Sequence, residues 1–185
     1  MNHFEFTGET KVFLGITLKR IKASISFGTI IKGEIGGWIE KEENLPGNAW
    51  VSGNAQVYGN ARVYGDARVY GDAQVYGDAQ VSGDAQVYGN ARVYGNAQVS
   101  GNARVYGDAW KKSPLHIMLT RWPLTVSTKT IITIGCNSFT VPKWEEKAET
   151  IAQKEGMNVD EITEYKLAIQ YAKQWMAIYC KSKED

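Results

Sequence analysis

Residues 57–80 read VYGNARVYGDARVYGDAQVYGDAQ, which is one six-residue unit repeated four times without insertion or deletion. The same unit extends in both directions, from Pro46-Gly47-Asn48-Ala49 to Tyr106-Gly107-Asp108-Ala109. A strict short period is typical of solenoid proteins, in which each unit buries its apolar residues only against neighbouring units. The sequence therefore predicts a repeat architecture for residues 47–109, flanked by the rest of the chain.

The residue types within one unit indicate a parallel β-helix. Valine recurs every six residues from 51 to 105, alanine from 49 to 109 and glycine from 47 to 107. In the unit Val57–Arg62, the valine and Ala61 can both point inward, while Gly59-Asn60 supplies the backbone freedom of a corner. A valine followed by an outward tyrosine suits a short strand. This matches the hexapeptide pattern of left-handed β-helices, in which three hexads make one coil of about 18 residues.

The positions of the charges favour this coil length. Residues one coil apart stack at the spacing of neighbouring strands, where like charges repel. At a spacing of 18, none of the four arginines of the repeat stack on each other, and only Asp66 and Asp84 do among the aspartates. A spacing of 12 would stack Asp66 on Asp78, Asp72 on Asp84 and Arg92 on Arg104.

A coil of this length sorts the outward residues after each valine into three columns. The columns are Ser52, Tyr70, Tyr88 and Tyr106; Tyr58, Tyr76 and Tyr94; and Tyr64, Ser82 and Ser100. Stacked tyrosines can stabilise their own sheet, and they can also form a docking surface, because tyrosine combines a large rigid area with a polar tip. The candidate partner-binding residues are Tyr58, Tyr76, Tyr94, Tyr70, Tyr88 and Tyr106.

Composition limits the kinds of partner. The formal net charge is +1, and 43% of the 185 residues are hydrophobic. The basic side chains are spread over the chain, so we do not expect direct nucleic-acid binding, which needs a concentrated positive field. No stretch approaches the length of a membrane-spanning helix, and the N-terminus lacks the pattern of a signal peptide. We expect a protein of the cytoplasm, without membrane contact, in which Cys136 and Cys180 are buried thiols.

The flanking segments divide the chain into four parts. We expect residues 1–46 to form strands that cap the solenoid, with Trp38 or Trp50 covering its open end, because a solenoid end exposes its core. The coil can begin near Gly36, since the hexad phase runs back from Val51 to Leu45 and Ile39. The β-helix is assigned to residues 47–110, a small antiparallel sheet to 111–142, and a helical segment to 143–185.

The last two parts predict an α+β appendage. Strands are expected at residues 115–119, 124–128, 130–134 and 139–141, then a helix that opens at Pro142 and ends at Gly156. A second helix begins near Asn158 or Asp160 and carries an apolar stripe. The stripe either packs on the sheet or solenoid or forms a dimer contact through Ile162, Tyr165, Ile169 and Met176.

Several sequence motifs on both sides of the hexads carry a family resemblance. Gly36-Gly37-Trp38-Ile39-Glu40, Glu43-Asn44-Leu45 and Gly47-Asn48-Ala49-Trp50-Val51 lead into the hexads. Together with Ser113-Pro114-Leu115, Ile134-Gly135-Cys136 and Trp144-Glu145, they resemble hexapeptide-repeat proteins of phages and prophages. The chain is also similar to bacterial β-helix proteins that carry a provisional transferase label, and the similarity covers roughly residues 12–146.

The best-known enzymes with hexapeptide β-helices are acyltransferases that use a histidine as general base. The two histidines here, His3 and His116, both lie outside the hexads. A general base must be held within hydrogen-bond reach of its proton; His3 lies near a chain end, and His116 fits a structural position in a strand. The pair Asp66 and Asp84 lies on an open, flat face of the repeat, without a cleft that could desolvate it for catalysis. We therefore expect no catalytic residues, no cofactor and no metal.

The resemblance and the missing catalytic groups together suggest a function. We expect a non-catalytic phage-type scaffold that binds a host protein, most specifically an inhibitor of a host anti-phage defence nuclease or of its signal. The competing classes are a hexapeptide-repeat acyltransferase and a self-assembling structural protein. A homo-oligomer is expected, with a dimer first and a trimer second.

Overall fold

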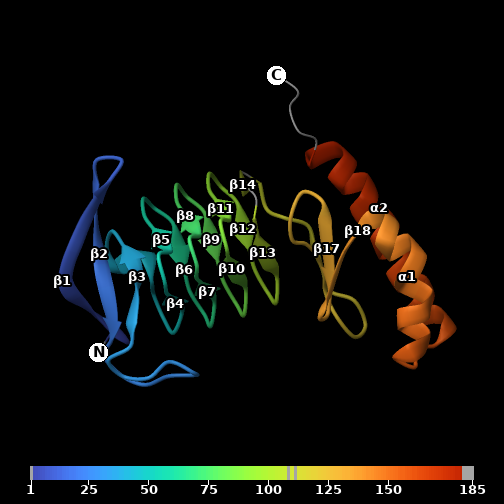
Figure 1. Ribbon diagram of the computed structural model, residues 1–185, viewed down its shortest axis with the longest axis horizontal. Coiled ribbons are helices and arrows are strands. Elements are labelled where there is room, and N and C mark those ends of the chain that lie inside the picture. The colour runs from blue at the N-terminus through green and yellow to red at the C-terminus, as the bar shows by residue number, and fades with distance from the viewer. Residues whose placement is uncertain (1, 108, 111, 181–185) are drawn as a thin grey trace. The chain divides into compact units, whose positions relative to one another are not determined.

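The chain forms two compact units, Met1–Ser113 and Pro114–Asp185. The computed structural model describes residues 2–107, 109–110 and 112–180 (Figure 1). The first unit contains an N-terminal hairpin and a parallel β-solenoid, and the second contains a small sheet with two helices. The predicted fold class, a mainly β protein built on a parallel β-helix, is confirmed.

The solenoid has three faces, each a parallel sheet of very short strands. The first face contains β3 (Ile35–Ile39), β5 (Gln56–Val57), β8 (Gln74–Val75), β11 (Arg92–Val93) and β14 (Ala109–Trp110). The second contains β4 (Trp50–Val51), β7 (Arg68–Val69), β10 (Gln86–Tyr88) and β13 (Arg104–Tyr106). The third contains β6 (Arg62–Val63), β9 (Gln80–Val81) and β12 (Gln98–Val99). The five strands of the first face mark about four turns.

The register confirms the predicted coil of 18 residues. Gln56 pairs with Gln74, and Gln74 with Arg92, so equivalent hexad positions lie side by side. Backbone N–H groups donate to carbonyl groups of the next coil, for example from Ser52 to Val69 over 2.9 Å. The valines of the repeat are buried, as predicted. The valine columns of the three faces therefore form one continuous apolar core.

The final step of the solenoid is one residue shorter than the others. Arg92 pairs with Ala109 and Val93 pairs with Trp110, a separation of 17 residues. Trp110 thus takes a valine position, and it is buried. The predicted phase, in which alanine positions recur every six residues up to 109, is therefore contradicted by the register at this last step, because Trp110 replaces the next valine.

The corners of the coils require glycine. Gly65 has a φ of 71°, in the left-handed region, and a Cβ added to it would lie 3.0 Å from the backbone nitrogen of Gly83. Both the backbone conformation and the close stacking of corners therefore exclude a side chain. This explains why glycine recurs at every corner of the repeat.

The N-terminal hairpin continues the first face of the solenoid. β1 (Phe4–Phe13) pairs antiparallel with β2 (Ile16–Ala23), which pairs antiparallel with β3 at the blue end of Figure 1. β2 buries Leu18 and Ile21 completely. The hairpin therefore adds two strands beside the first coil.

The expectation that Trp38 or Trp50 covers the open end of the solenoid core was wrong, because neither side chain points into the core. Trp38 pairs with Gln56 and Trp50 pairs with Arg68, which are outward positions, while the adjacent Ile39 holds an inward position. Side chains alternate along a strand, so a tryptophan before an inward residue must point outward. Both tryptophans are buried all the same.

A 3₁₀ helix, Glu42–Asn44, forms a corner of the first coil. The buried Asn44 amide donates to the carbonyl oxygens of Gly59 and Ala61, and its oxygen accepts from the Lys41 N–H. These bonds satisfy backbone groups of the next coil. The motif Glu43-Asn44-Leu45 thus begins the repeat by tying the first coil to the second.

The second unit packs two helices with a four-stranded antiparallel sheet. The strands are β15 (His116–Ile117), β16 (Leu124–Val126), β17 (Ile131–Ile134) and β18 (Asn137–Thr140). The helices are α1 (Val141–Lys154) and α2 (Val159–Tyr179). Asn158 caps α2 by accepting from the Glu161 N–H, and the buried Trp144 of α1 donates its indole N–H to the Ile132 carbonyl over 2.8 Å.

Cys136 is exposed, which contradicts the expectation of a buried thiol. It is exposed because it lies in the turn between β17 and β18.

Candidate functional site

The tyrosine columns are stacked ladders. In the first, the Tyr58 ladder, the ring centroids of Tyr58 and Tyr76 are 5.0 Å apart and those of Tyr76 and Tyr94 are 5.2 Å apart. In the second, the Tyr70 ladder, Tyr70 and Tyr88 are 5.0 Å apart, and Tyr88 and Tyr106 are 5.1 Å apart. The angle between neighbouring ring planes is 0° to 6° for all but the last pair, where it is 25°.

These distances determine the orientation of the tyrosine rings relative to one another. Rings lying flat and side by side would overlap at a centroid separation of 5 Å, so parallel rings this close must face one another. Each inner ring therefore has both faces covered by its neighbours, and the ladder presents ring edges and hydroxyl groups outward. Only the ring at the end of a ladder can offer a whole face to another molecule.

The Tyr58 ladder ends under the N-terminal hairpin. Tyr58 is only 6% exposed and packs in a cluster with Leu18 and Trp38, while Phe13 meets its ring at 5.9 Å in an edge contact. Lys11 and Arg20 lie over the Trp38 ring at 4.3 and 5.0 Å. Tyr58 is therefore not accessible to a partner, which corrects its place among the candidate binding residues; Tyr76 and Tyr94 are half-buried.

The Tyr70 ladder keeps all three of its rings partly accessible. Tyr70, Tyr88 and Tyr106 are half-buried, and the Tyr70 hydroxyl donates to the Gln86 side-chain oxygen over 3.2 Å. Burial raises the pKa of Tyr70, partly opposed by Arg104 and Arg68, and burial together with the neighbouring tyrosines raises the pKa of Tyr88. The phenols of Tyr70 and Tyr88 are therefore neutral hydrogen-bonding groups at physiological pH.

A row of long polar side chains accompanies the Tyr70 ladder. Arg68, Gln86 and Arg104 stack in register on the same face. Among the described residues, neither Arg68 nor Arg104 forms an ion pair. This face therefore combines phenol edges with two guanidinium groups that can bind a partner.

The third face differs because its column holds one tyrosine and two serines. Tyr64 is exposed and donates its hydroxyl to the Gln80 side-chain oxygen over 3.1 Å. The rungs after it are Ser82 and Ser100, whose smaller side chains leave the face without a ladder. This face provides matched control positions for the other two.

A groove lies at the N-terminal end of the Tyr70 ladder and is called the ladder groove below. Its volume is about 350 Å³. The lining residues are Thr29, Ile30, Glu34, Trp50, Ser52, Arg68, Tyr70 and Gln86. The hexad pattern alone does not predict this groove, although the serine at position 52, where the column otherwise holds tyrosines, is a signal of it in the sequence.

The proposed dimer contact on α2 lies inside the second unit. Tyr165, Ile169 and Met176 are buried, and Ile162 is half-buried. Tyr165 is 4% exposed, and its hydroxyl accepts from the backbone N–H groups of Arg121 and Trp122. The stripe therefore packs within its own unit, which corrects its assignment as an oligomer contact. The exposed apolar residues of α2 include Leu167, Tyr171 and Ile178.

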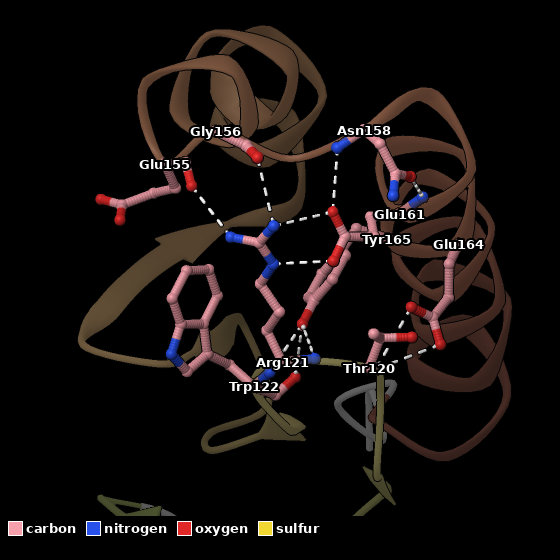
Figure 2. Close-up of polar contacts among 9 residues, drawn as sticks. All are labelled: Thr120, Arg121, Trp122, Glu155, Gly156, Asn158, Glu161, Glu164 and Tyr165. Carbon is pink, nitrogen blue, oxygen red and sulfur yellow. Dashed lines mark hydrogen bonds and ion pairs between the residues drawn. The ribbon is translucent and has the colours of Figure 1, made fainter.

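Figure 2 shows the polar cluster that fixes the start of α2. The Arg121 guanidinium donates to both carboxylate oxygens of Glu161, at 2.7 and 2.9 Å, and to the carbonyls of Glu155 and Gly156. The Glu161 carboxylate also accepts a hydrogen bond from the Asn158 N–H, and the bonds from Arg121 and Asn158 together hold the pKa of Glu161 below its ordinary value. Because all three guanidinium nitrogens of Arg121 donate to the start of α2 and to the turn before it, this cluster positions the turn between the helices.

The two histidines occupy packed, hydrogen-bonded positions. His3 is buried among the rings of Phe4, Phe27 and Trp50, and its Nε2–H donates to the Ala49 carbonyl over 2.9 Å. His116 forms a 2.8 Å hydrogen bond through Nδ1 with the Thr125 hydroxyl. Burial lowers the pKa of both imidazoles. Neither ring lines the ladder groove.

Neither a cluster of metal-binding side chains nor a membrane-spanning helix is found among the residues that the structure describes. Within them, no group of three or more histidine, cysteine, aspartate or glutamate side chains is arranged to hold a metal ion. The pair Asp66 and Asp84 occupies equivalent corners of successive coils. None of the described helices combines the length and the apolarity needed to cross a bilayer.

Comparison with protein families supports the repeat. A family model described as the YdcK β-solenoid repeat matches residues 55–71, 61–77, 85–99 and 97–111. No curated protein matches the chain. The matched segments all lie in the solenoid, and they agree with the observed coils. The chain is a β-solenoid repeat protein.

Proposed function

We propose that the protein is a non-catalytic binding scaffold whose Tyr70 ladder docks a partner protein. The observation that carries this proposal is the stacked, half-exposed row of Tyr70, Tyr88 and Tyr106 beside the guanidinium groups of Arg68 and Arg104, which form no ion pair with any residue that the structure describes. Tyrosine and arginine dominate the energetically important residues of protein interfaces.

A rigid ladder lowers the entropic cost of binding. Tyr88 is held between Tyr70 and Tyr106 at about 5 Å from each, and the Tyr70 hydroxyl is fixed by Gln86. Side chains that are already ordered lose little conformational freedom when a partner docks. The side chains of this face therefore already have their bound conformation before the partner docks. As a result, even a modest contact area can give a useful affinity.

The more specific form of the proposal concerns the partner. An inhibitor of a host anti-phage defence nuclease, or of its signal, fits a rigid binding surface without catalytic groups. This step rests on the resemblance to phage and prophage proteins, since a fold by itself does not define a function. It places the protein in the cytoplasm of the host cell.

A homo-oligomer, a dimer before a trimer, is also part of the proposal. The α2 residues first considered for it are packed inside the second unit, so another surface must supply the contact. Light scattering on the intact chain measures the oligomeric state. A monomer at all concentrations would remove this part of the proposal and leave the docking face unaffected.

The docking face is tested with two matched double variants. Tyr88→Ser with Tyr106→Ser removes two rungs of the Tyr70 ladder and leaves Tyr70 in place, whereas Tyr76→Ser with Tyr94→Ser removes two rungs of the Tyr58 ladder. Partners are captured from a bacterial host lysate with the native protein, identified, purified and titrated against each variant. Each important tyrosine should account for about 1 to 4 kcal/mol of affinity.

The two variants separate the possible outcomes. Loss of binding in the Tyr88 and Tyr106 variant alone supports the Tyr70 ladder as the docking face. Equal loss in both variants, with unchanged melting temperatures, assigns the partner to both faces. Full binding by both variants would show that the ladders only stabilise the solenoid.

A further inference from the structure

The ladder groove occupies the place of a missing rung. One face of the Tyr70 ring stacks on Tyr88 at 5.0 Å, and the residue one coil before Tyr70 is Ser52. Where the other ladder has a covering aromatic ring at its end, Tyr70 has a serine and an open space of about 350 Å³. The exposed ring face therefore offers a stacking site for a planar group.

The wall of the groove is an ordered loop. Phe27 and Ile30 exchange backbone hydrogen bonds of 3.0 and 2.8 Å across a tight turn, and Ile30 is buried. The Ser26 hydroxyl accepts from the Lys32 N–H, and the Glu34 carboxylate accepts from the Ile31 N–H. Since these bonds hold the loop in place, the groove is preformed, as binding sites for small molecules usually are.

Two opposite charges line the groove without pairing with each other. The described residues place no carboxylate within ion-pair distance of Arg68, although Glu34 lines the same groove. Arg68 lies under the loop, where a Cβ added to Gly28 would be 3.8 Å from its Nη2 atom. A half-buried, unpaired guanidinium is suited to an anionic group, and phosphate matches its planar donor geometry.

The remaining lining groups suit the edge of a heterocyclic base. Ser52 and Thr29 supply hydroxyl groups, Glu34 supplies a carboxylate, and Gln86 supplies an amide. Hydroxyl and carboxylate oxygens accept hydrogen bonds from the amino groups of purines. Ile30 and Trp50 provide the apolar wall.

We propose that the ladder groove binds a purine mononucleotide, with the base stacked on the open face of Tyr70 and the phosphate held by Arg68. The volume lies at the lower end of the range for small-molecule sites, which is suited to one nucleotide. Bases stack on aromatic side chains in sequence-tolerant nucleic-acid sites, and purines offer the larger stacking area. The absence of a concentrated basic field on the solenoid still argues against binding of a nucleic-acid polymer.

This proposal goes beyond the docking function and does not depend on it. Its ligand is a small molecule, and its site uses Ser52, Arg68 and the open face of Tyr70. The docking test changes Tyr88 and Tyr106, which lie further along the ladder. Either proposal can therefore fail while the other stands.

Calorimetric titration of the intact protein tests the proposal with AMP and GMP as probes. Adenosine carries the base without phosphate, and ribose 5-phosphate carries the phosphate without a base. Both nucleotides should bind at least about tenfold more tightly than either fragment, because the guanidinium contact and the stack act together. Pyrimidine nucleotides should bind more weakly.

Two pairs of variants locate the site. Ser52→Tyr builds the missing rung and should abolish nucleotide binding, whereas Ser82→Tyr adds a rung beside Tyr64 on the third face and should leave it unchanged. Arg68→Gln should weaken binding about tenfold or more, whereas Arg62→Gln on the third face should have no effect. Arg68→Gln keeps the hydrophobic packing intact, so it remains informative if Ser52→Tyr folds poorly.

Three results would overturn the proposal. They are no detectable heat with AMP or GMP at about 1 mM, nucleotide affinity no greater than that of ribose 5-phosphate, and equal weakening by Arg68→Gln and Arg62→Gln. The second result would indicate an anion contact without base recognition. The third would indicate nonspecific attraction to the charge of the solenoid.

Discussion

The two tyrosine ladders share one repeat and differ at their ends. Their rings stack at nearly the same distances, and the valines beneath them are equally buried. The Tyr58 ladder ends against Phe13 under the N-terminal hairpin, whereas the Tyr70 ladder ends at Ser52 and the ladder groove. The repeat thus determines the ladders, and the flanking segment determines which ring is accessible.

The pairing of β2 explains this difference. Because β2 pairs with β3, the hairpin adds to the face that carries the Tyr58 ladder and brings Phe13 and Leu18 onto Tyr58. The loop after β2 reaches the face of the Tyr70 ladder through Thr29 and Ile30, and there it forms the wall of a groove. One segment therefore covers the end of one ladder and leaves the other open.

The largest effect should come from charges placed in the shared core. Val75 lies beneath the Tyr58 ladder and Val87 beneath the Tyr70 ladder, and both are fully buried. Val75→Asp and Val87→Asp should each destabilise the fold by more than about 4 kcal/mol, because an unpaired carboxylate enters an apolar core. Denaturant unfolding measures the change, with the exposed Gln98→Asp as control. Markedly unequal losses would mean that the two faces differ inside the coil as well as outside it.

A smaller effect should separate the ends of the two ladders. Tyr58→Ser removes a buried ring and should cost about 3 kcal/mol of unfolding free energy, in the range for large-to-small core changes. Tyr70→Ser removes a half-buried ring and should cost about 1 kcal/mol. Thermal and denaturant unfolding of the two variants give the comparison directly. Similar losses would contradict the assignment of Tyr58 to the core and Tyr70 to the surface.

The sequence predicted the parts of the molecule that repeat. Six-residue periodicity located the inward valines and the outward columns, and the charges indicated a coil of 18 residues, as the pairing of Gln56 with Gln74 shows. The capping pattern at Asn158 and the glycine at 156 likewise indicated the two helices. These features depend on local residue types and on contacts between identical neighbours.

The features that the sequence did not predict depend on contacts between different segments. Nothing in the hexads indicates that Phe13 covers Tyr58, or that a loop near Ile30 stands beside Tyr70. The apolar stripe of α2 was compatible with either packing or a dimer contact, and burial of Tyr165 decides for packing. The orientation of the tyrosine rings, with their edges outward, also follows from the distances between ring centroids in the structure and not from the spacing of the tyrosines in the sequence.

Ser52→Tyr should convert the open ladder into a closed one. The new ring would stack on Tyr70, and an aromatic pair of this kind contributes about 0.5 to 1.5 kcal/mol beyond its buried area. We therefore expect a slightly raised melting temperature, with Ser82→Tyr, which stacks on Tyr64, as the matched control. A destabilised Ser52→Tyr protein beside a stabilised Ser82→Tyr protein would show that the loop leaves no room for a ring.

The smallest expected effect is the response of the ladders to alkaline pH. Burial raises the pKa of Tyr58 and of Tyr70 above the ordinary value of 10.0; Tyr76 adds to the rise at Tyr58 and Arg92 opposes it, whereas Arg104 and Arg68 both oppose the rise at Tyr70. A raised pKa means that the folded state holds the phenol proton more tightly than the unfolded state does. This contribution to stability is complete below the unfolded pKa and is lost as the pH rises through the folded pKa.

Denaturant unfolding at a series of pH values should show constant tyrosine-dependent stability up to about pH 10 and a decline above it. Tyr58→Phe and Tyr70→Phe keep the rings but remove one titrating group each, so the decline should be shallower in both variants. Because two arginines oppose the rise at Tyr70 and Tyr76 adds to the rise at Tyr58, Tyr70→Phe should change the slope less than Tyr58→Phe. Equal changes would show that burial alone controls the two phenols, and the opposite order would contradict the assigned charge effects.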